Sequence, residues 1–376
     1  MKPSGMRKVL FIFGTRPEAI KLSPVILEML KQPHEFNVRV CVTGQHRGLL
    51  DQVLTAFAIR PDHDLDLMLP GQTLFQSTSR ILAALEPVFD AECPDMVIVQ
   101  GDTTTTLCGA LAAFYKRIPV AHVEAGLRTH DMSQPFPEEM NRVVATRLAS
   151  IHFAATDAAA QNLQNEAVDP ASIHVTGNTG IDAVLYVRDG LQEGRLTAQA
   201  WPGLDPAKKL VVVTAHRRES FGPGFERICT ALVQLARSGV QIVYPVHPNP
   251  NVLDPVNRIL RDEPGIVLTE PLDYIPFVDL MRRAYLLITD SGGVQEEGPS
   301  LGKPILVLRD KTERPEAVIA GTVKLVGTDP ARILFEARKL LENKEAYETM
   351  ARVLNPYGDG HASGRICRLI HSFIRR

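Results

Sequence analysis

The sequence predicts an α/β protein made of two doubly wound domains, each with a parallel sheet. Short apolar runs bounded by turn residues alternate with longer amphipathic stretches along the whole chain, a pattern typical of βα units. The alternation restarts about half-way along the chain. With 376 residues, 45% of them hydrophobic and 22% charged, the chain has an ordinary globular composition and a length for which two domains are the first expectation.

In the first half, apolar runs predict strands over residues 8–13, 38–43, 96–100, 120–123, 151–155 and 173–177. Amphipathic stretches between them predict helices over 18–31, 49–58, 73–89, 105–116 and 138–149. A helix over 181–188 follows, and then residues 191–209 show no clear period. We therefore place the connection between the domains near 177–205.

In the second half, the predicted strands are 210–215, 241–246, 267–270, 286–289, 304–308 and 323–326. Helices such as 225–237, 275–284 and 332–341 lie between them. A turn-rich break over 355–360 precedes a final helix over 361–374, whose apolar face could pack on either domain. That face carries Ile366, Leu369, Ile370 and Phe373.

Charge and cysteine content exclude several classes of protein. The formal net charge of -2 removes the electrostatic argument for binding nucleic acid or an anionic membrane. The five cysteines are widely spaced and form no CxxC pair, which predicts neither disulfides nor a zinc site. The apolar stretch over residues 9–13 is too short for a signal peptide or a membrane span. We expect a cytoplasmic protein without a metal.

The first predicted strand runs into Gly14, Thr15, Arg16 and Pro17. Proline suits the first turn of a helix, whose free amides can bind an anion. Arg16 and Lys21 would then lie near the carboxyl edge of the sheet. The alternative is an ordinary βα turn with a surface arginine, and the GxxxxGK[ST] spacing of a phosphate loop is missing.

Two later strands of this domain end at carboxylates, Asp102 and Glu124. In the usual doubly wound strand order, these strands are neighbours beside the topological switch point, so Arg16, Asp102 and Glu124 should converge. Burial and a neighbouring negative charge both raise the pKa of a carboxyl group. A raised pKa suits a general acid or base that works near neutral pH. Asp102 has a competing role, because an Asp before a helical run is a good N-cap.

Two further carboxylates, Glu138 and Glu139, start a predicted helix, and their spacing alone indicates helix-end charges. His216 ends the first strand of the second domain, beside two arginines. A histidine there can contact phosphate or transfer a proton, although a lone histidine is more often structural.

The strand over 286–289 leads into Ser291, Gly292 and Gly293, with Glu297 about one helical turn further on. Glycines that open a helix let a diphosphate approach free backbone amides, and Glu297 could accept the hydroxyl protons of a ribose. This pattern indicates a nucleotide site. Because GxGxxG and GxxxxGK[ST] are both missing, dinucleotide and P-loop sites are disfavoured.

A set of uncommon strings occurs in order between about residue 8 and residue 360. They are FGTRPEAIK from Phe13, GDTTTT from Gly101, HVEAGLR from His122, PEEMNR from Pro137, HRRES from His216, TDSGGVQEE from Thr289, TERPE from Thr312 and NPYGDG from Asn355. Together they resemble the non-hydrolysing UDP-N-acetylglucosamine 2-epimerases of bacteria.

This resemblance implies a GT-B fold, in which two Rossmann-like domains (1–177 and 178–360) enclose the active site in their cleft and the final helix (361–376) packs on the first domain. It implies reversible conversion of UDP-N-acetylglucosamine to UDP-N-acetylmannosamine for surface polysaccharide synthesis, in a homodimer and without cofactor, nucleic acid or membrane. By position, Asp102, Glu124 and Glu138 match the catalytic carboxylates and His216 the cleft histidine. The matching nucleotide-sugar contacts are Arg16, Lys21, Phe277, Ser291, Gly292, Gly293, Glu297 and Arg314.

The sequence also departs from the family. In some members an arginine is linked to binding of a second, activating substrate molecule, and residues 69–72 of this chain lack it. We therefore do not predict activation, although the segment 45–47 resembles the activator region of the family. Leu272 replaces a glutamine near uracil. A hydrolysing epimerase, a GT-B glycosyltransferase and a non-enzymatic nucleotide-sugar sensor remain as alternatives.

Overall fold

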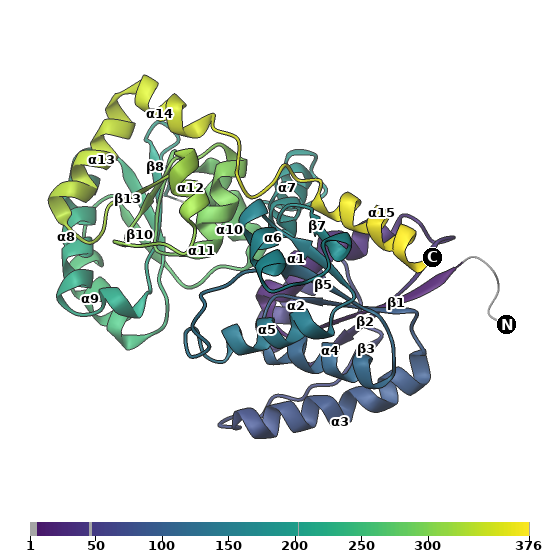
Figure 1. Cartoon of the computed structure of the whole chain (residues 1–376). Coiled ribbons are helices and arrows are strands. Elements are labelled where there is room, and N and C mark those ends of the chain that lie inside the picture. The colour runs from purple at the N-terminus through teal and green to yellow at the C-terminus, as the bar shows by residue number, and fades with distance from the viewer. Residues whose placement is uncertain (1–5, 45–46, 202, 376) are drawn as a thin grey trace. The chain divides into compact units, whose positions relative to one another are not determined.

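The structure, a computed structural model, describes residues 6–44, 47–201 and 203–375 (Figure 1). The chain forms two compact units, as the fold class predicts. Unit 1 comprises Met1–Ala183 and Gly358–Arg376, and unit 2 comprises Val184–Tyr357. The division falls inside helix α7 (Thr179–Gln192) rather than after residue 177, because one continuous helix carries the chain from one unit into the other.

Unit 1 contains a seven-stranded parallel sheet in the order β3-β2-β1-β4-β5-β6-β7. Strand β1 pairs with β2 on one side and with β4 on the other, so the sheet grows in opposite directions from β1 and has its topological switch point between β1 and β4. The strands are β1 (Arg7–Phe13), β2 (Phe36–Val42), β3 (His63–Asp64), β4 (Met96–Gln100), β5 (Val120–Ala125), β6 (Ile151–Ala154) and β7 (Ile173–Val175). Strand β3 was not predicted, because two residues give no readable period.

Helices connect these strands and cover the sheet. They are α1 (Arg16–Leu30), α2 (Arg47–Ala56), α3 (Leu74–Glu92), α4 (Thr104–Tyr115), α5 (Glu138–Leu148) and α6 (Asp157–Asn165). The buried residues of β1 are all apolar, and those of β4 are apolar up to Gln100 at its end, as expected where helices cover both faces of a parallel sheet.

Unit 2 repeats the plan with a six-stranded parallel sheet in the order β10-β9-β8-β11-β12-β13, and its switch point lies between β8 and β11. The strands are β8 (Leu210–Thr214), β9 (Gln241–Pro245), β10 (Ile266–Thr269), β11 (Leu286–Thr289), β12 (Ile305–Val307) and β13 (Val323–Leu325). The helices are α8 (Pro223–Arg237), α9 (Pro250–Leu260), α10 (Tyr274–Arg283), α11 (Gly292–Glu297), α12 (Pro315–Ala320), α13 (Pro330–Glu342) and α14 (Lys344–Ala351).

The last helix, α15 (Ala362–Ile374), packs against α1 of unit 1, and Figure 1 shows this yellow helix beside the purple N-terminal elements. Ile366 and Ile370 are fully buried there. Asp182 of α7 accepts hydrogen bonds from the backbone N–H groups of Ala362 and Ser363, at 3.3 and 2.8 Å, and so caps the helix. A side chain 180 residues away in sequence therefore fixes where α15 begins.

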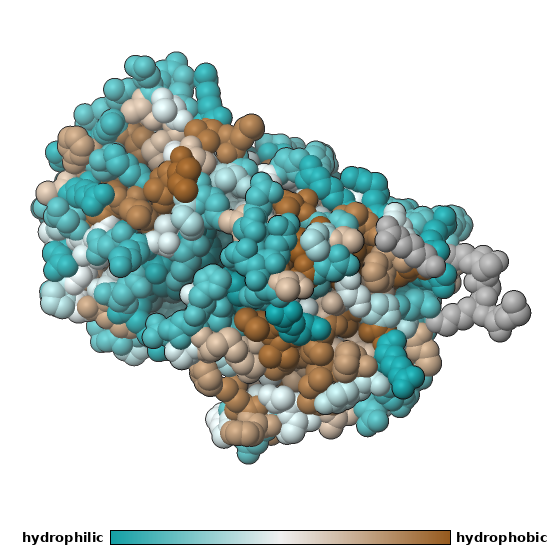
Figure 2. Space-filling model, in the orientation of Figure 1, coloured by the Kyte–Doolittle hydropathy of each residue, from teal (hydrophilic) through white to brown (hydrophobic). Residues whose placement is uncertain are grey.

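Unit 1 also exposes apolar side chains on α3 and α4. Phe75 is 88% exposed, and Leu74, Phe114 and Tyr115 are also exposed. Figure 2 shows brown side chains over the lower part of the view, where these helices lie. No helix in the described ranges is both long and apolar enough to cross a bilayer.

Candidate active site

The predicted residues of unit 1 lie at the carboxyl ends of three neighbouring strands. Arg16 is the first residue of α1, just after β1, and Asp102 follows β4. Glu124 is the penultimate residue of β5. Glu138 is the first residue of α5, the helix that follows β5. Since β1, β4 and β5 are adjacent, these four residues lie along one edge of the sheet.

Asp102 does not cap α4. The cap is Thr103, whose hydroxyl accepts a hydrogen bond from the Thr106 N–H at 3.1 Å. The Asp102 carboxylate instead forms an ion pair with Arg142 of α5 at 2.7 Å, and its backbone carbonyl accepts a hydrogen bond from the Asn141 side chain at 2.9 Å. Tertiary contacts therefore decide between the two roles that the sequence left open.

The electrostatic surroundings of Asp102 suit proton transfer. Burial raises the pKa of its carboxyl above the usual value, and the Arg142 guanidinium opposes that rise. The negative charges of Glu124 and Glu138 raise the pKa further. Glu124 and Glu138 are therefore both close enough to influence Asp102.

Glu124 lies in an irregular part of β5. Its φ of 63° is in the left-handed region, and the pairing of β5 with β6 shifts between Val123 and Ala125. The carboxylate accepts hydrogen bonds from Lys21 of α1 and from Gln100 at the end of β4. Lys21, expected as a nucleotide-sugar contact, thus holds Glu124 in the structure.

The contacts of two buried residues beside these carboxylates could not be predicted from the sequence. Glu139, 1% exposed, accepts hydrogen bonds from the backbone N–H groups of Thr129 and His130 and lies 3.4 Å from Arg142. His122 of β5 shares a hydrogen bond of 2.7 Å with the Gly101 carbonyl. Burial lowers the pKa of His122 to about 3, so the ring is neutral and donates to that carbonyl. Both residues stood within the family strings, but spacing indicated only a helix-end charge for Glu139 and no role for His122.

In unit 2, His216 follows β8, and its Nδ1 lies 3.3 Å from the Asp290 carboxylate. Burial lowers the pKa of His216 below its usual value, while Asp290 opposes that fall. The ring stacks on His247 with a centroid separation of 5.4 Å. His216 is therefore neutral near pH 7 and able to accept a proton or a hydrogen bond.

Asp290 is fully buried and was also missed. Its carboxylate accepts hydrogen bonds from the backbone N–H groups of His216 and Arg217, each at 2.7 Å. Because Asp290 follows β11 and His216 follows β8, one carboxylate ties together the two loops at the switch point of unit 2.

The nucleotide-site pattern begins helix α11. Ser291 occupies the N-cap position but makes no side-chain capping bond. A Cβ added to Gly292 would lie 3.1 Å from the Arg314 guanidinium carbon, so Arg314 lies directly against this glycine. Arg314 also forms an ion pair with Glu296 at 2.8 Å. The structure therefore brings Arg314, distant in sequence, to the helix start that the sequence indicated.

The remaining predicted residues of unit 2 lie on nearby elements. Glu297 is the last residue of α11, and the half-buried Phe277 belongs to α10. Of the predicted activator segment, residues 45 and 46 lie outside the described residues. No group of three or more His, Cys, Asp or Glu side chains placed to hold a metal ion occurs in the described ranges.

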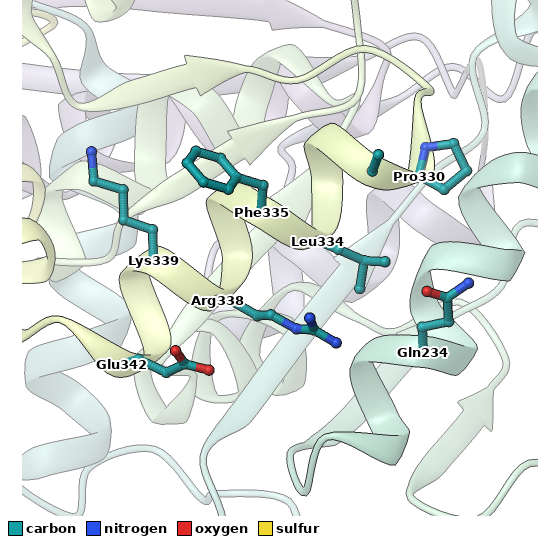
Figure 3. Close-up of a pocket in the computed structure, with 8 residues that line it drawn as sticks. Gln234, Pro330, Leu334, Phe335, Arg338, Lys339 and Glu342 are labelled. Carbon is teal, nitrogen blue, oxygen red and sulfur yellow. The ribbon is translucent and has the colours of Figure 1, made fainter.

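A separate groove of about 680 Å³ lies on unit 2 between α8 and α13 (Figure 3). Gln234 of α8 lines it together with side chains of α13, among them Phe335, which is 66% exposed. None of the predicted site residues lines this groove. Its lining by side chains of α8 and α13 distinguishes it from the candidate active site.

Comparison with known proteins identifies the family. Residues 28–371 match the family model for UDP-N-acetylglucosamine 2-epimerase. The UDP-N-acetylglucosamine 2-epimerase of Salmonella typhimurium is 55% identical over 372 residues, which cover 97% of this chain and 99% of that protein. This chain belongs to the UDP-N-acetylglucosamine 2-epimerase family.

Further relatives agree with this assignment. The UDP-N-acetylglucosamine 2-epimerase of Escherichia coli K12 is 56% identical over 365 residues, covering 96% of this chain and 97% of that protein. The crystal structure of the Neisseria meningitidis UDP-GlcNAc 2-epimerase bound to UDP-GlcNAc superposes with a TM-score of 0.88 at 46% identity, covering 97% and 100% of the two chains. The family resemblance and the GT-B fold predicted from the motifs are confirmed.

Proposed function

We propose that this chain is a non-hydrolysing UDP-N-acetylglucosamine 2-epimerase, which interconverts UDP-N-acetylglucosamine and UDP-N-acetylmannosamine. The observation that carries the proposal is the group of three carboxylates, Asp102, Glu124 and Glu138, at one edge of the unit 1 sheet. Binding a negatively charged diphosphate gains nothing from acidic groups, so these carboxylates point to proton transfer. The names of the full-length relatives support the same substrate.

The chemistry requires such groups. The proton on carbon 2 of the sugar is not next to a carbonyl, so a carboxylate cannot remove it directly. As the C1–O bond to UDP breaks and UDP leaves with the bonding electrons, positive charge builds at carbon 1 and acidifies the neighbouring C–H bond. A carboxylate then takes the carbon-2 proton, and the electrons of that bond form the C1=C2 double bond of 2-acetamidoglucal.

Re-addition completes the epimerisation. A proton is delivered to the opposite face of carbon 2, and a diphosphate oxygen of UDP bonds again to carbon 1. At least two proton-handling groups are needed, one for each face of the sugar. No step of this route transfers a hydride, so it needs no nicotinamide, and the proposal assigns stabilisation of the leaving diphosphate to side chains and backbone amides of the chain.

Contacts with neighbouring side chains support the proposed proton transfer, because they hold two of the carboxylates in place. The ion pair with Arg142 orients Asp102, and hydrogen bonds from Lys21 and Gln100 orient Glu124. We assign proton transfer to Asp102, Glu124 and Glu138. The proposal assigns a second group of residues to contacts with UDP. They are Arg16, Lys21, His216, Phe277, Ser291, Gly292, Gly293, Glu297 and Arg314.

Proton NMR in D₂O tests the proposal. Purified protein with UDP-N-acetylglucosamine, without added metal or NAD, should give carbon-2-deuterated UDP-N-acetylmannosamine in equilibrium with substrate. Glu124→Gln should keep UDP binding and lose turnover by roughly a hundredfold or more. Glu92→Gln is a matched control, because Glu92 is a similarly buried carboxylate paired with a lysine, Lys8, far from the carboxyl edge of the sheet.

Each alternative function predicts a different result. Free N-acetylmannosamine with UDP would indicate the hydrolysing class. An unchanged spectrum would refute epimerisation and leave a glycosyltransferase without its acceptor, or a sensor. A sensor should also keep its full function in the Glu124→Gln variant.

We also propose a homodimer that supplies surface polysaccharide synthesis from the cytoplasm. The exposed apolar side chains of α3 and α4, among them Phe75 and Phe114, support a second copy as their partner. The five cysteines, all in the described part of the chain, form no disulfide, which supports a reducing compartment. Light scattering should give twice the chain mass of 41.4 kDa, and Phe75→Glu should shift the protein towards monomer.

A further inference from the structure

Glu18, on the first turn of α1, accepts hydrogen bonds from two different βα loops. The side chain is 1% exposed. One carboxylate oxygen, Oε2, accepts the backbone N–H groups of Gly14 at 3.0 Å and Thr15 at 2.8 Å. The other, Oε1, accepts the hydroxyls of Thr103 at 2.7 Å and Thr106 at 3.2 Å.

Capping α1 does not require this arrangement. A capping box needs only the bond from the N3 side chain back to the N-cap N–H. The capping box of α3 shows the minimum, because Gln76 accepts from the Thr73 N–H and both residues are exposed. Glu18 satisfies the same motif with one oxygen, and its second oxygen serves another helix.

The burial of Glu18 indicates that the second link is specific. The four donors to Glu18 named above, two backbone N–H groups and two hydroxyls, are uncharged. Burial therefore raises the pKa of Glu18, and the hydrogen bonds from Thr103, Thr15 and Gly14 oppose that rise. A carboxylate kept in this setting depends on all its donors being in place.

The two loops that Glu18 joins carry proposed active-site residues. Arg16 lies between Thr15 and Glu18 at the start of α1, and Asp102 directly precedes Thr103. The loops follow β1 and β4, the strands at the switch point of unit 1. The distance between the starts of α1 and α4 thus depends on one side chain.

We propose that Glu18 is a positioning residue, which fixes the α1 start with Arg16 against the α4 start beside Asp102; the proposal rests on the proposed epimerase function. In this proposal Glu18 itself does not contact the substrate. Its effect is geometric, because small misplacements of reacting groups reduce turnover strongly.

The test compares variants that keep or break the link. Glu18→Ala should lower kcat by roughly tenfold to a hundredfold. The affinity for free UDP should fall by less than kcat, because most of the groups assigned to UDP belong to unit 2, whereas, of these groups, Glu18 holds only the loop that carries Arg16. Glu18→Gln should recover most of kcat, because its amide oxygen can still accept from Gly14 and Thr15 while its NH₂ donates to the Thr103 hydroxyl.

Two controls separate positioning from stability. Gln76→Ala removes the N3 partner of the α3 capping box and should leave kcat unchanged. Thr103→Val removes the hydroxyl that donates to Glu18 and, with it, the N-cap of α4, so its kcat loss is compared with its stability in urea unfolding. Thr103→Ser keeps both hydrogen bonds and should restore kcat. These two variants also test the link if Glu18→Ala does not fold.

Three results would overturn the proposal. Glu18→Ala or Thr103→Val with wild-type kcat would show that the link has no effect on turnover. Equal losses of kcat and UDP affinity would indicate a general folding defect.

If wild-type protein does not epimerise, the proposed function fails, and amide hydrogen exchange still tests the link. Glu18→Ala should then speed exchange in the first turn of α4, and unchanged exchange there would refute it.

Discussion

Arg128 and Glu166 form a buried ion pair behind the loop that follows Glu124. The Arg128 side chain is 1% exposed, and its guanidinium binds both Glu166 oxygens, at 2.6 and 3.0 Å. It also donates to the Thr146 hydroxyl at 2.9 Å and to its neighbour's carbonyl at 2.7 Å. The guanidinium therefore fastens this loop to α5 and α6.

Removing the acid should cost more than removing the pair. Glu166→Ala leaves a buried guanidinium without its counter-charge, which costs about 3–5 kcal/mol, compared with about 0–1 kcal/mol for a surface pair. Glu166 is 22% exposed, so water can reach the vacated position, and we expect about 3 kcal/mol. The double variant Arg128→Met with Glu166→Leu buries no unpaired charge and should cost less than Glu166→Ala alone.

The loss should depend on pH in a defined direction. Hydrogen bonds from Arg128 hold the pKa of Glu166 below its usual value. The folded pKa lies below the unfolded one, so the pair stabilises the protein above the unfolded pKa and is lost as pH falls through the folded pKa. The difference between wild type and Glu166→Ala should therefore be largest near neutral pH and shrink below about pH 4.

Urea unfolding followed by circular dichroism measures this difference at several pH values. The single tryptophan, Trp201, lies in unit 2 and reports that unit separately by fluorescence. A Glu166→Ala cost within about 1 kcal/mol of wild type at neutral pH would refute the reasoning, because the pair would then behave like a surface contact. A difference that grows as pH falls would refute the sign.

Three further predictions test other parts of the fold. Gly126→Ala should lower the free energy of unfolding in urea by at least about 2 kcal/mol, because its φ is 92° and an added Cβ would lie 2.2 Å from the Ala159 carbonyl oxygen. Gly71→Ala, where φ is also positive but the space is open, should lower it by less, and equal losses would contradict the clash. His216 should titrate below 6.5 by NMR, and Asp290→Asn should lower its pKa further, so an upward change would exclude the assigned charge effect. Deleting α15 removes two buried isoleucines and should destabilise unit 1 by on the order of 3–6 kcal/mol, whereas unchanged thermal unfolding would show that α15 contributes nothing.

The sequence alone determined the fold class and the edge of each sheet that carries the candidate site. Both follow from local patterns, because parallel strands buried on both faces are continuously apolar and the loops at their carboxyl ends hold the unusual residues. Strand β4 was predicted with the bounds that the structure shows, and Arg16 and Asp102 follow β1 and β4 as expected, whereas Glu124 lies within β5, which extends two residues past its predicted end. The final helix was recognised, but its partner was left open.

Only the tertiary structure decided what each side chain contacts. Asp102 could have capped α4 by local rules, but Arg142 from α5 binds it, and the partner of Lys21 is Glu124, about a hundred residues away. The buried carboxylates Glu18 and Asp290 had no role in the sequence reasoning, because a polar residue looks the same in sequence whether water or distant backbone donors surround it. Burial and long-range hydrogen bonds set charge and position, and both exist only once the sheet brings separate loops together.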